Sequence, residues 1–272
     1  MLKTEKLKYV YEDGTVALDN INIDLGKGER IGIIGSNGSG KSTLFLNIMG
    51  ILKPKKGAVI FNNAPIKYNK KYLRKFRESV GIVFQDPDKQ IFYSNVYDDV
   101  AFALRNLGYD EDKIKERVEN ALKKTGAYAF KDKPVHFLSY GQKKRVAISG
   151  VLAMNSDIIL FDEPTAGLDP VMTEAVRDII YKLSSENKKI IMSSHNMDSI
   201  YEICDYVYVL DKGRIIGEGA VEEVFVKDQL LQKAGLNEPW LVKIHKNMGI
   251  PLFKDEESLY KYWRENNLCK LQ

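Results

Sequence analysis

The sequence predicts an α/β fold with a parallel sheet that is covered on both of its faces. Two observations carry this prediction. First, residues 31–34, 80–84 and 158–161 are short apolar runs, and strands buried on both faces are nearly continuous in hydrophobic residues. Second, helical patterns separate such runs, as in residues 171–183, where apolar side chains recur at intervals of three and four. Strands that alternate with helices are typical of parallel sheets.

The N-terminal segment and two later segments are also expected to form strands. Residues 3–34 are predicted to contain strands broken by a tight turn at Glu12-Asp13-Gly14, because residues 18–25 alternate with a period near two. Residues 189–193 and 206–210 are further apolar runs of strand length. The last two runs are expected to belong to the same parallel sheet as the apolar runs above.

A change of pattern predicts the division of the chain. Residues 94–155 show helical patterns without strands, among them residues 110–125, and we expect an all-helical subdomain inserted there. After residue 220 only short helical patterns follow. We therefore predict one domain over residues 1–220 and a small C-terminal appendage over residues 221–272.

Composition excludes several classes of protein. Hydrophobic residues make up 44% and charged residues 29% of the 272, as in an ordinary globular protein. No apolar run approaches the roughly 18 residues of a membrane span, and the first residues lack a signal peptide's apolar region. Cys204 and Cys269 lack CxxC spacing, which argues against a disulfide or zinc site. The net charge of +4 is small and its lysines are dispersed, so we expect no nucleic-acid partner.

The strongest motif is a phosphate loop of the pattern GxxxxGK(S/T), formed by Gly35, Ser36, Asn37, Gly38, Ser39, Gly40, Lys41 and Ser42. An apolar strand precedes it, and a helix is expected at residues 42–49. Glycines let backbone N–H groups converge, and the helix N-terminus adds its positive end. Lys41 can reach the outer phosphates of a nucleoside triphosphate and Ser42 can bind Mg²⁺. We group Thr43, the next residue, with them. An incidental glycine-rich turn is the alternative.

Polar residues end two of the predicted strands. Asp162 and Glu163 follow residues 158–161, at the sheet edge where ligands of open α/β sheets bind. Asp162 is a candidate to hold Mg²⁺ through water, and Glu163 a candidate general base for an attacking water. Both could instead be solvated acids that cap the next helix. His195 closes another strand, where it could sense a γ-phosphate or be merely structural.

The segment Leu138-Ser139-Tyr140-Gly141-Gln142 precedes an apparent helix at residues 143–154. Three cations, at residues 143–145, would occupy the first turns of that helix, where the helix dipole disfavours positive charge. An anion docked there, with Ser139 supplying a hydroxyl, would explain them. The alternative is a plain Ser N-cap with solvated basic side chains.

Taken in order, these motifs resemble those of ATP-binding cassette (ABC) ATPases over about residues 3–220. The set comprises the phosphate loop, Gln85 after a strand, the LSYGQ segment, Asp162-Glu163, Gly167-Leu168-Asp169 and His195. The resemblance implies an ABC-type P-loop core with an N-terminal antiparallel β subdomain, and ATP and Mg²⁺ as cofactors. Family signatures usually have LSGGQ, and here Tyr140 replaces the first glycine.

The resemblance also implies roles for individual residues. Gln85 would be the Q-loop residue and His195 the switch histidine, both catalytic together with Glu163. Mg²⁺ ligands would be Ser42, Gln85 and Asp162. Nucleotide contacts beyond the phosphate loop would come from Tyr11, which would stack on adenine, and from Ser139, Gly141, Gln142 and Asp169. A plain strand or turn tyrosine is the alternative for Tyr11.

Within the family, the segment FQDPDKQIF at residues 84–92 resembles the Q-loop of cobalt-type and energy-coupling-factor importers. Residues 11–18 and the tail after residue 235 favour the same group. This implies an ATPase on the cytoplasmic face of the cell membrane, bound to integral membrane transporter subunits and to a second ABC ATPase subunit, identical or not. Cobalt is the first candidate cargo, with nickel or a B-vitamin next. A soluble cassette acting on ribosomes or DNA and a P-loop kinase are the other classes considered.

Overall fold

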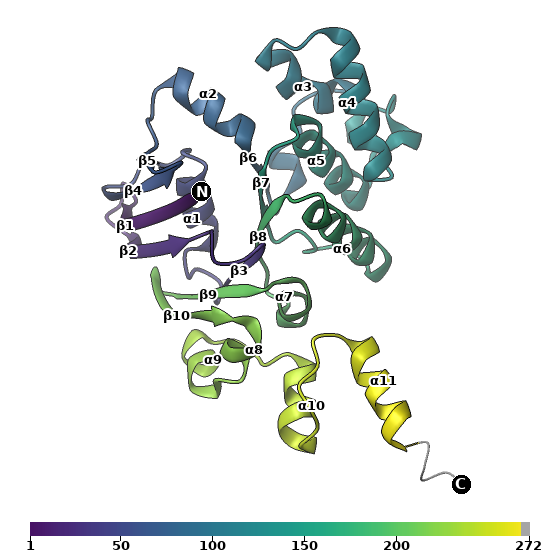
Figure 1. The fold of residues 1–272 in the computed structure, drawn as a ribbon. Coiled ribbons are helices and arrows are strands. Elements are labelled where there is room, and N and C mark those ends of the chain that lie inside the picture. Colours follow the sequence, from purple (N-terminus) through teal and green to yellow (C-terminus); the bar gives the residue numbers. More distant parts are fainter. Residues whose placement is uncertain (268–272) are drawn as a thin grey trace.

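The computed structural model describes residues 1–267, and a six-stranded sheet lies at its centre (Figure 1). Its strand order is β10-β9-β3-β8-β7-β6. Five strands are parallel, and β10 runs antiparallel to β9 at one edge. The predicted parallel sheet is therefore confirmed. Its strands are β3 (Arg30–Ile34), β6 (Val80–Val83), β7 (Ile158–Asp162), β8 (Lys189–Ser193), β9 (Tyr206–Asp211) and β10 (Arg214–Ala220).

The apolar runs are continuous because alternate residues of each strand enter two different cores. Along β7, Ile159 and Phe161 join one cluster while Ile158 and Leu160 join the other. The first cluster is covered by α5 (Tyr140–Met154), α6 (Pro170–Ser185) and α7 (Met197–Ile203). The second is covered by α1 (Lys41–Ile48) and by the N-terminal sheet.

The N-terminal sheet is antiparallel, as predicted, with the order β2-β1-β4-β5. The predicted turn joins its first two strands, with Gly14 at φ 88°, a left-handed conformation that glycine adopts without steric cost. Two short strands and a helix in this region were not predicted. The elements are β1 (Leu2–Val10), β2 (Val16–Asp24), β4 (Lys56–Phe61), β5 (Ala64–Pro65) and α2 (Lys70–Ser79).

Residues 94–155 contain helices, short 3₁₀ turns and one isolated β-bridge between Asn95 and Pro134. They have a hydrophobic cluster of their own. The helix predicted at residues 143–154 begins three residues earlier, at Tyr140, because Ser139 caps it. The elements that precede it are η1 (Pro87–Lys89), α3 (Val96–Leu107), α4 (Glu111–Lys124), η2 (Tyr128–Phe130) and η3 (Val135–Phe137).

The C-terminal helices form the lower part of the molecule in Figure 1. They are α8 (Val221–Phe225), α9 (Asp228–Ala234), α10 (Trp240–Met248) and α11 (Glu256–Asn267). Side chains of these helices, Phe225 and Leu241 among them, belong to the same cluster as β7 and β8. The boundary at residue 220 therefore stays a prediction, since the cluster runs across it.

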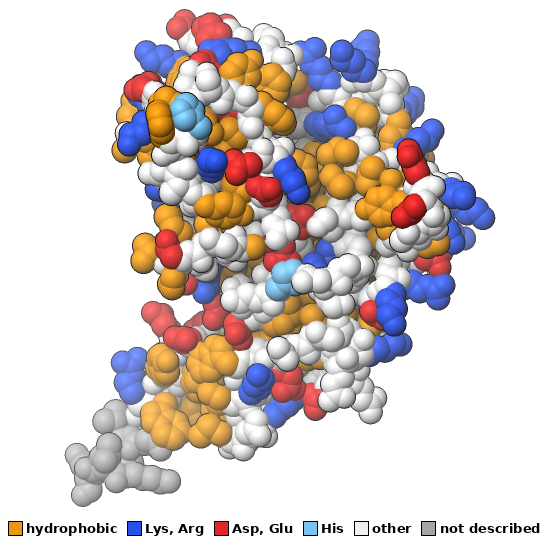
Figure 2. Space-filling view, turned by 180° about the vertical axis from the view of Figure 1, so that it is seen from behind, with side chains coloured by type: hydrophobic (Ala, Val, Ile, Leu, Met, Phe, Trp, Pro, Cys, Tyr) orange, Lys and Arg blue, Asp and Glu red, His pale blue; other side chains and the backbone are white. Residues whose placement is uncertain are grey.

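Within residues 1–267 no helix combines the length and hydrophobicity that a bilayer crossing needs. The face shown in Figure 2 carries Lys and Arg side chains interspersed with acidic ones rather than gathered in one patch. Apolar side chains gather on the C-terminal part of that face, close to the residues drawn in grey.

Candidate functional site

The phosphate loop leaves β3 at Gly35 and ends in the first turn of α1. Glycine is required at two of its positions. A Cβ on Gly35 would lie 2.2 Å from the carbonyl oxygen of Leu210, and one on Gly40 would lie 2.8 Å from that of Ala17. Gly40 also has φ 111° and caps α1 without any side-chain hydrogen bond. The first N–H groups of α1 are therefore left to a ligand, as in anion sites at helix N-termini.

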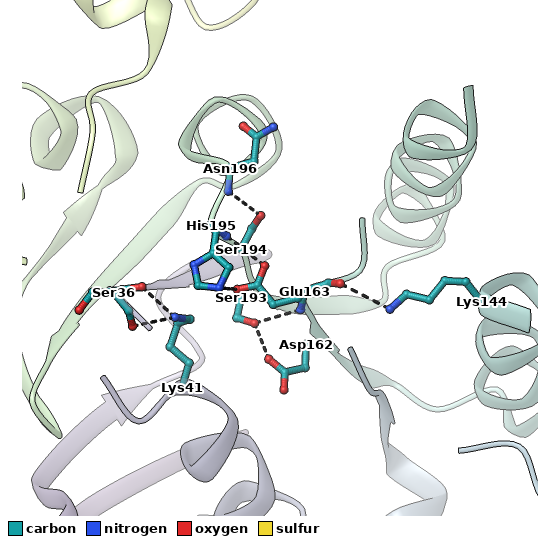
Figure 3. A network of polar contacts seen from close by, with 10 residues as sticks. Ser36, Lys41, Lys144, Asp162, Glu163, Ser193, Ser194, His195 and Asn196 are labelled. Carbon is teal, nitrogen blue, oxygen red and sulfur yellow. Dashed lines mark hydrogen bonds and ion pairs between the residues drawn. The ribbon is translucent and has the colours of Figure 1, made fainter. Parts of the chain in front are cut away.

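The side chain of Lys41 folds back onto the phosphate loop. Its Nζ donates to the carbonyl oxygens of Gly35 at 2.8 Å and Ser36 at 3.1 Å (Figure 3). Burial lowers the pKa of Lys41, and the carboxylates of Glu163 and Asp162 oppose that shift. The ammonium group of Lys41 therefore lies within the phosphate loop. Ser39 adds a buried hydroxyl without a hydrogen-bond partner, a group that a bound phosphate could satisfy.

Asp162 ends β7 and is buried, with its Oδ1 accepting a 2.6 Å hydrogen bond from the hydroxyl of Ser193 on β8. The same hydroxyl accepts from the backbone N–H of Glu163 at 3.1 Å. Parallel pairing places Asp162 opposite Ser193. Ser193 therefore joins the two acids, and it was not predicted. The sequence feature that could have indicated Ser193 is its position two residues before His195, at the end of an apolar run.

The side chain of Glu163 faces His195 (Figure 3). Nε2 of His195 lies 3.1 Å from Oε1, and the backbone N–H of His195 donates to Oε2 at 3.0 Å. Glu163 has φ 48°, an uncommon backbone conformation for a residue with a side chain. Burial raises the pKa of its carboxyl group, against the opposing charges of His195 and Lys41. A carboxylate with a raised proton affinity, held by its neighbours, suits a general base.

Lys41, Glu163 and His195 line a cleft of about 500 Å³, whereas Asp162 and Ser193 are not among its lining residues. Its walls include the phosphate loop, Gln85, Glu163, His195 and Tyr11, whose hydroxyl shares a 2.8 Å hydrogen bond with that of Thr43. Tyr11 lies at the rim with 40% of its surface exposed, next to the ring of Tyr9. A smaller cavity lined by α4, α5 and α6 contains none of the predicted site residues.

The donor set fits Mg²⁺, a hard cation that takes few protein ligands and keeps phosphate and water oxygens. Ser42 and Gln85 line the cleft and offer a hydroxyl and an amide oxygen, while Asp162 lies behind Ser193. Within the described residues no three His, Cys, Asp or Glu side chains form a metal cluster.

The LSYGQ segment does not line the cleft. Ser139 is exposed at the start of α5, where its Oγ accepts from the N–H of Gln142 at 3.3 Å while Oε1 of Gln142 accepts from the N–H of Ser139. Gly141 follows in the first turn, and Asp169 is an exposed N-cap of α6. Ser139, Gly141, Gln142 and Asp169 therefore lie outside the cleft that the phosphate loop shapes.

The structure shows the N-cap of the alternative at Ser139, but the three cations after it are not simply solvated, because each has a partner within the chain. Lys143 pairs with Asp88 at 2.7 Å, and Arg145 donates to the carbonyl oxygen of Gly126. Lys144 is fully buried and donates to backbone carbonyls. The cations also lie past the first three residues of the helix, which begins at Tyr140.

The model of the ABC transporter family matches residues 18–166. The chain belongs to the ABC transporter family. An ABC transporter ATP-binding protein of Listeria monocytogenes, so named only provisionally, is 54% identical, with 96% of this chain and 98% of the relative covered. The cobalt import ATP-binding protein CbiO of Salmonella paratyphi A is 46% identical over 96% of both chains. The energy-coupling factor transporter ATP-binding protein EcfA3 of Clostridium perfringens is 48% identical over 88% of this chain and 84% of its own.

Solved structures agree with this assignment. CbiO1 of Clostridium perfringens, described as part of an ABC transporter complex, superposes with a TM-score of 0.75 and 47% identity, over 92% of this chain and 98% of that one. A dimeric ATP-binding cassette with ADP and Pi bound gives 0.74 and 29%, over 81% of this chain and 99% of that one. As an ABC transporter ATPase, the chain binds ATP and couples its hydrolysis to transport.

Proposed function

We propose that the chain is the ATP-hydrolysing subunit of a membrane importer of transition metal ions, with Co²⁺ as the first candidate cargo. The observation that carries this proposal is the identity of 46% to a cobalt import ATP-binding protein over 96% of both chains. The Q-loop segment at residues 84–92 supports the same subfamily. Energy-coupling-factor import of a vitamin is the second candidate, because the EcfA3 relative is equally similar.

In the proposed reaction, Glu163 accepts a proton from the water that attacks the γ-phosphate. His195 holds the carboxylate of Glu163 and contacts the γ-phosphate, and Lys41 leaves its loop carbonyls for the outer phosphates. Tyr11 stacks on the adenine at the rim of the cleft. Mg²⁺, held by Ser42, Gln85 and Asp162, would neutralise charge on the phosphates. The geometry that supports these roles is the shared cleft and the contacts between Glu163 and His195.

A second ABC ATPase subunit is part of the proposal. Ser139, Gly141, Gln142 and Asp169 lie outside the chain's own cleft, so they are free to meet a nucleotide held by a facing subunit. The dimeric cassette with ADP and Pi bound, 29% identical to this chain, supports this arrangement. Whether the facing subunit is a second copy or a related chain is decided by the assembly experiment in the Discussion.

Integral membrane subunits are the other proposed partners, and they would hold the chain at the cytoplasmic face of the cell membrane. An exposed aromatic group beside the Q-loop supports a docking surface. Phe92 is 74% exposed, and its ring lies 6.4 Å from that of Phe102, which also contacts Tyr93. The carboxylate of Asp99 accepts from the N–H groups of Phe92 and Tyr93, so these rings are presented on an ordered loop.

The proposal is tested by uptake of labelled Co²⁺ into cells that express this chain with its co-purifying membrane proteins. A matched set carries Glu163→Gln, and labelled Ni²⁺ and B-vitamins are offered in parallel. We expect Co²⁺ entry to fall in the variant set. Equal Co²⁺ entry in both sets, with a difference for a vitamin, would replace the metal by the second candidate.

A further inference from the structure

Lys144 is a fully buried cation that the reaction above does not use. Its Nζ donates to the carbonyl oxygens of Gln85 at 2.8 Å, Phe84 at 3.0 Å and Glu163 at 3.4 Å. Figure 3 shows it reaching from α5 toward the loop that carries Glu163. An ammonium group has three N–H donors, and three carbonyls receive them here. Burial lowers the pKa of Lys144 to about 8, and the carboxylates of Asp162, Glu163 and Asp86 oppose that shift from beyond ion-pair distance.

This arrangement is unusual for a lysine, because lysines are almost never fully buried unless a charge is paired with them. If Lys144 served packing alone, an apolar side chain would serve better. Its carbonyl partners come from two segments: Phe84 and Gln85 belong to the Q-loop, and Glu163 follows β7. The side chain therefore joins two loops of the site to the first turns of α5.

Tyr140 makes a second tie to the same loop. Its hydroxyl donates to the carbonyl oxygen of Gln85 at 3.0 Å, so that oxygen accepts from both Tyr140 and Lys144. On its other side, the ring approaches Gly167, where a Cβ would lie 3.2 Å from Cε1 of Tyr140. The tyrosine that replaces a glycine of the usual signature thus contacts the loop before Asp169 as well as the Q-loop.

We propose that Lys144 is a positioning residue for ATP hydrolysis, which ties the backbones of Gln85 and Glu163 to helix α5 so that the Q-loop and the catalytic loop move as one unit. Tyr140 reinforces the tie at Gln85. A shift of the Q-loop is then passed to the backbone of Glu163 through one ammonium group. The inference rests on the roles proposed above for Gln85 and Glu163.

The test compares Lys144→Met with Lys254→Met in the full chain. Lys254 is the control, because its partly buried Nζ also donates to a backbone carbonyl, that of Cys204 at 2.8 Å, away from the cleft; unlike Lys144 it also pairs with a carboxylate, that of Glu222 at 3.2 Å. Nucleotide affinity, kcat and hydrogen exchange are measured on each protein. For Lys144→Met we expect kcat to fall roughly 10- to 100-fold, since a misplacement of about 1 Å can cost about 10²-fold. ATP affinity should be unchanged, and exchange should rise at residues 84–90 and 162–166.

Wild-type kcat in Lys144→Met would overturn the proposal, and so would an equal loss of affinity and kcat, which would indicate general unfolding. If Lys144→Met does not fold, Tyr140→Phe decides, because it removes only a hydroxyl near the surface. If hydrogen exchange at residues 84–90 is unchanged in Tyr140→Phe, the proposed attachment of the Q-loop backbone to α5 is refuted. The kcat of Glu163→Gln is measured alongside. If Glu163→Gln keeps its activity, the proposed role of Glu163 is refuted. If Glu163→Gln is inactive while Lys144→Met has normal kcat, only the inference about Lys144 is refuted.

Discussion

Both carboxylate oxygens of Glu163 face a single residue, His195. The imidazole Nε2 lies 3.1 Å from Oε1, and the backbone N–H of His195 donates to Oε2. The side chain of Glu163 is 6% exposed and that of His195 45%. Glu163 is therefore fixed in the protein while His195 reaches the cleft. A contact between His195 and a phosphate would then alter the interactions of His195 with the carboxylate of Glu163.

The first prediction follows from that relation. Glu163→Gln keeps the size of the side chain and removes its basicity, so we expect MgATP binding to persist while kcat falls by about 10² to 10⁴. Asp112→Asn is the comparison, because it alters an exposed acid of α4 that has no part in the proposed site, and it should leave kcat and MgATP binding unchanged. Phosphate release and nucleotide titration measure the two quantities, and near-normal turnover in Glu163→Gln would remove it from the role of general base.

The pH dependence of kcat provides a second prediction. Burial raises the pKa of the Glu163 carboxyl group above its ordinary value of 4.5. A general base must be ionised, so the rate is expected to fall as pH falls through this raised pKa, and to be fully developed above it. Measurements of kcat over acid pH test this, and in Glu163→Gln we expect the decrease in kcat at low pH to be absent. A wild-type profile flat down to pH 4.5 would contradict the assignment.

The third prediction concerns Lys41. Lys41 Nζ donates to the carbonyl oxygen of Gly35 at 2.8 Å, so Lys41→Ala removes this loop contact together with the proposed phosphate ligand. Hydrogen bonds to charged groups contribute about 1.5–3 kcal/mol, so ATP affinity should drop roughly 10- to 100-fold. Lys55→Ala removes an exposed lysine outside the cleft and should bind ATP normally. Equal affinities in the two variants would count against a role of Lys41 in binding.

The sequence predicted the phosphate loop and the strand-end acids because each depends on local pattern. A strand, a glycine-rich turn and a helix follow one another within a few residues, and parallel strands bring Asp162 and His195 to one edge. Lys144 was misinterpreted because its carbonyl partners lie about sixty residues earlier and nineteen later in the chain. Its helical spacing to Ala147 and Ile148, both buried, was the available signal.

Other parts of the fold could not be predicted for the same reason. Strand β4 is held by pairing with β1 at the start of the chain, so a long-range partner determines it more than local propensity does. Strand β10 instead forms a hairpin with β9 across Lys212 and Gly213, both at positive φ, so a local turn signal was present there and was missed. The packing of α8 and α10 into the core of the sheet likewise depends on tertiary contacts. Cys204 proved to be a buried free thiol, whereas Cys269 lies outside the described residues.

The fourth prediction concerns the proposed docking surface. Phe92→Ala removes an exposed ring beside the Q-loop without opening a core, so basal ATP hydrolysis should persist. If a membrane subunit packs on that ring, its loss should cost about 2 kcal/mol or more, which is about 30-fold or more in affinity for that subunit, and coupled transport should fall with it. Transport and ATP hydrolysis are measured on the same reconstituted complex, with Met248→Ala, an exposed apolar residue of α10, as the control. Equal loss of both activities would assign Phe92 to catalysis alone.

The last prediction concerns assembly, and it follows from the division of the site. The chain's own cleft lacks Ser139, which is exposed at the start of α5 and has no cation of the phosphate loop beside it. If Ser139 completes the site of a facing subunit, ATP should hold two chains together whenever hydrolysis is blocked.

We expect Glu163→Gln with ATP to form a stable dimer in light scattering. Ser139→Arg in the same background should stay monomeric, because a bulky cation fills the contact between the two chains. Ser139→Ala loses the same helix cap, worth about 1 kcal/mol, and the same hydroxyl but adds no bulk or charge, so we expect it to weaken the dimer rather than abolish it. Strictly monomeric Glu163→Gln at saturating ATP would rule out a pair of identical chains, and a dimer formed only on adding a co-purified cassette would assign the facing site to that second chain.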